Sequence, residues 1–285
     1  MLKPSAASVR GGTLRDTILL EQIMSRARTV LLLLMVFSVS SIATAQRFGR
    51  RRPDPVNLNT PITPYDGRLL IARLKFETGP GGYYYQGLPA WAHGYPKGEN
   101  NLVRIIREIS TVRPHMNASN VLALDDPSLG KFPVAYMAEP DYWTMNDKEA
   151  LALRAYLQKG GFIIFDDFRD NYGNGMNGWG NFVTQLQRVI PNAKFIDLDP
   201  SFPIFHSFFE INSFSIIPQS YDRSRPILRG LFEDNDPKKR MIAMINFNTD
   251  VSDFWEFSGT GYSVVSDDNE AYKLGVNYIV YALTH

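Results

Sequence analysis

The stretch LQKGGFIIFDDF, residues 157–168, joins the end of a predicted helix to a predicted buried strand. The pair Gly160 and Gly161 is typical of a helix terminus, where glycine adopts the left-handed conformation at little steric cost. The apolar run 161–165 follows without polar alternation, as in strands that are buried on both faces of a sheet. A helix that leads directly into such a strand indicates an α/β protein with a largely parallel sheet.

Helix and strand patterns alternate on both sides of this stretch. The preceding helix is predicted to begin at Thr144, with Asp147 three residues later in a near capping box. Further helices are predicted at 101–112, 181–190 and 270–283, and strands at 68–76, 121–124, 133–138, 193–198 and 241–245. The rest of 199–268 is expected to mix loops with a few further strands. This order predicts one domain, residues 65–285, with helices on both sides of its sheet.

Residues 1–45 have the features of an export signal. Arg26 and Arg28 precede the apolar run 30–37, and the small-residue site Ala43-Thr44-Ala45 follows it. These features predict a secretory signal peptide with Met24 as its start. We therefore expect an exported protein that is periplasmic or secreted after cleavage near Ala45. The alternative is an uncleaved membrane anchor, although the run is shorter than the ~20 residues that cross a bilayer.

Composition narrows the class of protein further. Residues 46–64, rich in arginine and proline, predict an extended linker. The 30 basic and 29 acidic residues nearly cancel, which argues against nucleic acid as the partner because phosphate binding needs a basic surplus. The chain has no cysteine, so disulfides, thiolate metal ligands and cysteine nucleophiles are excluded.

Acidic residues follow several of the predicted strands. Asp125 follows strand 121–124, and Asp166 and Asp167 follow the buried strand. Asp250 and Asp253 come soon after strand 241–245. Ligands of open α/β sheets bind at the carboxyl ends of the strands, and carboxylates there suit a divalent cation. No cofactor is required by the sequence; if a divalent cation binds, Asp166 and Asp167 are its predicted ligands. The alternative is that these acids are turn residues, since aspartate often begins a loop.

Histidine and aromatic residues supply further candidates. His206, in the irregular stretch DPSFPIFHSFFE, is a candidate general base or ligand, or else packs under a loop. The long segment 77–100 contains Tyr84 and Trp91, and the glycine-rich stretch 173–180 contains Trp179. These aromatic side chains are candidates for binding a sugar ring, or for covering the edge of the domain itself. The glycine-rich stretch lacks the lysine and hydroxyl residue of a phosphate-binding loop, so it does not predict a nucleotide site.

The ordered set IARLKF, NLVRIIREIS, LQKGGFIIFDDF, HSFFE, NFNTDVSDFWE and GVNYIVYALTH resembles the exported bacterial domain of unknown function numbered 4159. The resemblance runs from about Tyr65 to His285. It implies a flavodoxin-like, three-layer sandwich with a mostly parallel central sheet, related to class I glutamine amidotransferases. Those relatives use a cysteine nucleophile at a strand-to-helix turn, which this chain lacks, so glutamine hydrolysis by that route is excluded. The resemblance implies no catalytic residues.

Two functions are compatible with these sequence features. A non-catalytic binding module of the cell envelope, with a protein or glycan partner, is favoured because no complete catalytic triad is present. The alternative is a metal-assisted hydrolase of a glycan or ester, with Asp166 and Asp167 on the cation and His206 moving protons. A structural component of an envelope assembly is a third, less specific possibility. Whether the protein is an enzyme is left undecided by the residues alone.

Overall fold

The fold is described from a computed structural model. The structure describes residue 58 and residues 60–84, 87–116, 119–170, 177–214 and 225–285. The predicted signal peptide and the linker up to residue 57 lie outside the described residues. The described part of the chain falls within one compact unit, Val56–His285. Among its helices, none has the length and apolar character that a membrane span requires.

The centre of the fold is a seven-stranded sheet in the order β5-β1-β6-β8-β11-β10-β9. Its strands are β1 (Ala72–Lys75), β5 (Asn120–Ala123), β6 (Val134–Ala138), β8 (Phe162–Phe168), β9 (Ile196–Asp197), β10 (Ile227–Phe232) and β11 (Met241–Phe247). The first five strands of this order are parallel, whereas β10 is antiparallel to both of its neighbours. Two small pairs lie outside the sheet: β2 (Glu77–Thr78) with β7 (Trp143–Thr144), and β3 (Tyr83–Tyr84) with β4 (Leu88–Pro89).

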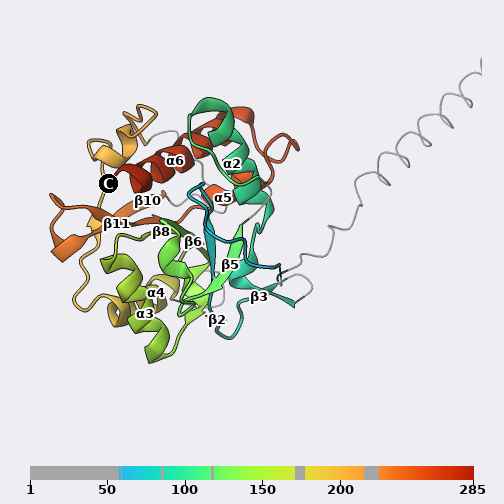
Figure 1. The fold of residues 1–285 in the computed structure, drawn as a ribbon. Helices are drawn as coiled ribbons and strands as arrows, with labels where there is room; N and C mark the ends of the chain where they lie inside the picture. The colour runs from blue at the N-terminus through green and yellow to red at the C-terminus, as the bar shows by residue number, and fades with distance from the viewer. Residues whose placement is uncertain (1–57, 59, 85–86, 117–118, 171–176, 215–224) are drawn as a thin grey trace, which may run out of the picture. The chain divides into compact units, whose positions relative to one another are not determined.

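Helices cover both faces of this sheet (Figure 1). One face packs on α3 (Asp147–Gln158) and α4 (Gly178–Val189), and the other on α2 (Lys97–Ile109), α5 (Val251–Glu256) and α6 (Val265–Thr284). Every residue of the central strands β8 and β11 is buried, because each has a helical layer on both sides. The α/β class and the mostly parallel sheet expected from the sequence are therefore confirmed.

Several element boundaries differ from those predicted. The cap of α3 is Asn146 rather than Thr144: its side chain accepts from the Glu149 amide, and the Glu149 carboxylate accepts from the Asn146 amide. This is the capping box, displaced by two residues from the predicted one. Helices α2 and α6 begin four and five residues early, because their first turns are largely polar and carry no apolar period. Strand β9 has two residues, since only Arg229 and Gly230 pair with it at the sheet edge.

The order of the strands creates a crevice at one edge of the sheet. After β1 the chain crosses to β5, and it then returns to β6 on the other side of β1. The connections that follow β1 and β6 therefore diverge at the carboxyl ends of these two strands. In open α/β sheets, ligands bind at this switch point. The connection after β1 contains the short helix η2 (Ala90–Ala92), which contacts both β1 and β6.

Candidate cation site at the carboxyl edge of the sheet

Three neighbouring parallel strands end in residues with a strained backbone. Glu139 directly follows β6 with φ 45, Asp167 lies near the end of β8 with φ 62, and Asn248 directly follows β11 with φ 62. Residues with a Cβ rarely adopt this left-handed region, and each such residue costs about 1–3 kcal/mol. Strain of this kind gathers at functional sites. Here it turns the chain so that acidic side chains meet above the sheet.

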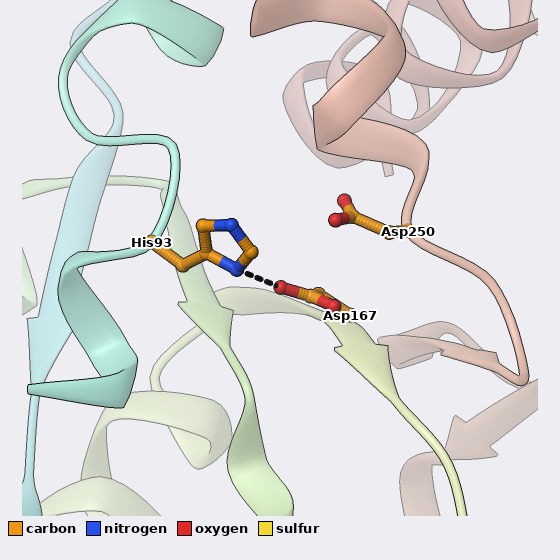
Figure 2. Close-up of side chains that lie close together, drawn as sticks. All are labelled: His93, Asp167 and Asp250. Carbon is orange, nitrogen blue, oxygen red and sulfur yellow. Dashed lines mark hydrogen bonds and ion pairs between the residues drawn. The ribbon is translucent and has the colours of Figure 1, made fainter. Parts of the chain in front are cut away.

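His93 brings the only imidazole into this group of acids. It directly follows η2, and its Nδ1 lies 2.7 Å from Glu139 Oε1 and 2.6 Å from Asp167 Oδ2. One ring nitrogen carries at most one hydrogen, so it cannot donate well to two oxygens at such distances. Figure 2 shows that the carboxylate of Asp250 points toward His93 and Asp167. One ligand atom from each of these three residues lies within 4.8 Å of the others.

Asp250 is placed by the helix that it begins. It caps α5, and its Oδ1 accepts from the Asp253 amide at 2.8 Å and from Ser252 Oγ at 2.9 Å. The side chain of Asp250 is completely buried, and Asp253 is 5% exposed. Helix α5 thereby delivers two carboxylates to the same edge of the sheet as Glu139 and Asp167.

The acids of this group have unusual pKa values because they are buried near one another. Burial and the charge of Asp250 raise the pKa of Asp253 to about 8. The same two causes raise the pKa of Asp167, and burial raises that of Glu139. Burial alone would lower the pKa of His93, but the carboxylates of Asp167 and Glu139 outweigh it and raise that pKa. The group gathers more carboxyls than one imidazolium can balance once they ionise, and a divalent cation that displaces their protons would offset that charge.

Asp166, one of the predicted ligands, is instead surrounded by hydrogen-bond donors. Its carboxylate accepts from Tyr136 Oη at 2.5 Å, from Asn246 Nδ2 at 3.1 Å, and from the amides of Val251 and Ser252 at 3.3 and 3.0 Å. These donors come from β6, β11 and α5. Asp166 therefore ties three elements together beneath the site, whereas Asp167 faces His93.

His206 and Asp125 have other partners. His206 Nδ1 bonds to Glu210 and its Nε2 to the carbonyl of Pro200, so both ring nitrogens are engaged within its own loop. Asp125 pairs with Lys148 at 2.7 Å, and that hydrogen bond lowers the pKa of Asp125. Neither residue is brought to the His93 group by the contacts that the structure describes.

Of the predicted aromatic residues, the structure describes the side chains of Trp179 and Trp91. Trp179 lies on α4, where its ring packs near Phe168 and under the guanidinium of Arg229 at 4.2 Å. Trp91 is 4% exposed in η2, two residues before His93. Tyr84 belongs to β3, and its side chain lies outside the described residues, as does 171–176 of the glycine-rich stretch.

Sequence reasoning did not select Glu139 and His93 as candidate site residues. Glu139 follows strand 133–138 directly, just as Asp166 follows its own strand, so applying the strand-end argument to every strand would have found it. For His93 the sequence shows only its place in a long connection. Such connections in compact domains are often functional, which is the one available signal.

We expect the metal-free protein to be more stable at about pH 6 than at about pH 8.5. The pKa of Asp166 is raised to about 7 by burial and by Asp250, and that of Asp253 to about 8, from the ordinary aspartate value of 3.8. The stability linked to these protons is fully present below about pH 4 and is lost as pH rises through 7 and 8. The raised pKa of His93 acts in the same direction. Thermal unfolding in EDTA checks this, and a stability that rises steadily to pH 8.5 would contradict it.

The fold and the site together define an α/β domain with a histidine–carboxylate group at the carboxyl edge of a mostly parallel sheet. The family model described as "Domain of unknown function (DUF4159)" matches residues 71–283. The chain therefore belongs to this family. No protein with a curated description matches the chain.

Proposed function

We propose that this domain binds a divalent cation through His93, Glu139, Asp167 and Asp250 and uses it in a hydrolytic reaction. The observation that carries the proposal is His93 Nδ1, which faces two carboxylate oxygens at 2.6 and 2.7 Å. A single proton on this nitrogen satisfies only one of the two carboxylates. A cation that replaces it could bind all three atoms, once these have separated to roughly 3 Å to allow metal–ligand bonds of about 2.0–2.2 Å. The buried position of Asp167 and Asp250 and the strained strand ends support the same conclusion.

The ligand set favours a transition-series cation over Mg²⁺ or Ca²⁺. Carboxylate oxygens suit all of these ions, but an imidazole nitrogen suits Zn²⁺, Fe²⁺ and related ions better than it suits Ca²⁺ or Mg²⁺. Mn²⁺ accepts both kinds of ligand and is the practical probe. A bound cation of this kind lowers the pKa of a water molecule and polarises a substrate oxygen.

Asp253 is the candidate for moving the proton in such a reaction. It adjoins Asp250 on α5, and its pKa of about 8 lies near neutral pH, where a general base is most effective. Tyr262 Oη lies 3.5 Å from its Oδ2, so a phenol is also at hand beside this carboxylate. We propose an envelope glycan or ester as the substrate, in keeping with the predicted export of the chain.

We also propose a flavodoxin-like fold related to the class I glutamine amidotransferases. Numbered along the chain, the five parallel strands have the order 2-1-3-4-5, which is the flavodoxin-like order. Asp167, with its positive φ, occupies a sharp bend at the end of β8. This bend places a carboxylate at a strand end, where the amidotransferase relatives carry their cysteine at a strand-to-helix turn.

The cation itself is tested by binding. We expect Mn²⁺ or Zn²⁺ to bind the EDTA-treated protein and to raise its thermal stability, by about 2.7 kcal/mol when the free ion is at about 100 times its dissociation constant. Isothermal titration calorimetry and elemental analysis of the purified protein measure this. A His93→Ala variant is the control and should lose most of the effect. Absence of Mn²⁺ and Zn²⁺ binding at millimolar concentration would refute the proposed function.

A non-catalytic glycan-binding module is the second candidate, and one cavity favours it. A cavity of about 360 Å³ lies beside the β3–β4 pair and is lined in part by Phe76, Tyr83 and Trp91. Its volume falls within the range of small-molecule pockets, and the ring of Tyr83 is 58% exposed. A metal-loaded protein that binds oligosaccharides without cleaving them would establish this function in place of hydrolysis.

A further inference from the structure

Arg73 is a charged side chain in the centre of the molecule. It lies on β1, is completely buried, and its Nε donates to Glu99 Oε1 on α2 at 2.6 Å. Burying such a pair costs several kcal/mol per ion, and apolar residues of similar size often stabilise a protein equally well. Stability alone is therefore a weak explanation for this ion pair.

The remaining contacts of Arg73 point to the candidate site. Its Nη1 donates to the carbonyl of Trp91 at 3.0 Å and to the carbonyl of His93 itself at 2.9 Å. The guanidinium lies over the ring of Tyr136 at 4.6 Å, and the ring of Tyr95 is 5.7 Å away. A planar guanidinium packed in this way has little freedom, so the two carbonyls that it binds are held in place.

These contacts determine where the His93 ring lies. The backbone of 91–93 turns around the guanidinium, and the His93 side chain leaves this turn toward β6 and β8. Its Nδ1 then meets Glu139 and Asp167. Loss of the two carbonyl contacts would free the turn, since no helix or strand of the main sheet contains His93.

We propose that Arg73 is a positioning residue that holds His93 Nδ1 against the carboxylates of Glu139 and Asp167. The geometric statement stands without a cation, and its consequence for cation affinity rests on the proposed function. Groups that orient metal ligands from behind typically change metal affinity by about 10- to 100-fold when they are replaced. Replacing a residue that only stabilises the fold would lower the unfolding temperature and leave the cation affinity of the folded protein unaltered.

Arg73→Lys and Arg73→Met test this by Mn²⁺ titration of the full chain. Lysine keeps the charge but cannot reproduce the fork that binds Glu99 and two carbonyls, so at least about tenfold weaker binding is expected. The matched control is Leu186→Ala, a completely buried residue of α4 in the other layer. It should lower the unfolding temperature and leave Mn²⁺ affinity unchanged. An Arg73→Lys variant that binds Mn²⁺ as tightly as the wild type would overturn the proposal.

A metal-free measurement separates this proposal from the proposed function. A ring N–H held by a carboxylate gives a low-field proton signal in NMR spectra, which His93→Ala assigns. We expect this signal in the metal-free wild type and its loss in Arg73→Lys, while Leu186→Ala keeps it. If the wild type binds no Mn²⁺, the proposed function fails and the signal alone decides. Its loss in Arg73→Lys then supports the positioning role, and its persistence overturns that role.

Discussion

Asp167→Asn is expected to abolish cation binding and, at about pH 8, to raise the stability of the metal-free protein. Asparagine removes one ligand charge, and we expect Mn²⁺ affinity to fall by at least about 100-fold, since even groups behind the ligands change it by 10- to 100-fold. In the metal-free state, the raised pKa of Asp167 means that its ionisation opposes folding. A neutral amide removes that cost. Asparagine also tolerates the φ of 62 at this position better than other residues with a side chain.

Calorimetry with Mn²⁺ and thermal unfolding in EDTA measure the two halves of this prediction. Asp125→Asn is the matched control, because Asp125 is a surface acid that pairs with Lys148. Replacing the Asp125 carboxylate should change the free energy of unfolding by no more than about 0.5 kcal/mol and leave cation binding intact. An Asp167→Asn variant that keeps the wild-type Mn²⁺ affinity would exclude Asp167 as a ligand.

Asp166→Ala is expected to cause the largest loss of stability, about 3–5 kcal/mol in urea unfolding. The change removes an acceptor from four donors, and in this buried position those donors have no water to replace it. Each buried donor left without an acceptor costs about 1–3 kcal/mol, so the loss of two or more of these bonds reaches this range. Asp166→Asn keeps one acceptor oxygen and should lose roughly half as much stability on the same reasoning.

The same variants separate the two roles considered for Asp166. If Asp166 ties β6, β11 and α5 together, Asp166→Asn should remain folded and bind Mn²⁺ with affinity within about tenfold of the wild type, an allowance that follows from its place behind the ligands. If it is a ligand, binding should disappear in Asp166→Asn although stability is nearly unchanged. The second result would reverse the roles that the geometry assigns to Asp166 and Asp167.

Much of the architecture can be read from local patterns. The unbroken apolar run 161–165 marks a strand covered on both faces, and the central strand β8 has every residue buried. The acids at strand ends follow from the same reasoning, and they place Asp167 and Asp250 at one edge. Apolar periodicity does not predict the length of a strand when pairing with a neighbouring strand sets that length, as for the two-residue edge strand β9.

The membership of the site depends on register, which no local pattern contains. Ala138 of β6 pairs with Asp166 of β8, so the next residues along the two strands, Glu139 and Asp167, emerge together. Asp166 and Asp167 are adjacent in sequence and alike in chemistry. Their roles separate at an irregularity of β8, where the pairing with β11 shifts register and Asp167 adopts a positive φ. Of the two, Asp167 meets His93.

The sequence by itself determined the α/β class with a mostly parallel sheet, the acids that follow its strands, and the exclusion of a cysteine nucleophile. Each of these depends on residue type and on short-range periodicity, which are present in the chain before it folds. Only the tertiary structure decided that His93 and Glu139 meet Asp167 and that Asp166 is held by donors from three other elements. Residues separated by 46 and 74 positions meet at His93 Nδ1. Their distances depend on strand register and on contacts between segments far apart in the chain, which exist only in the folded protein.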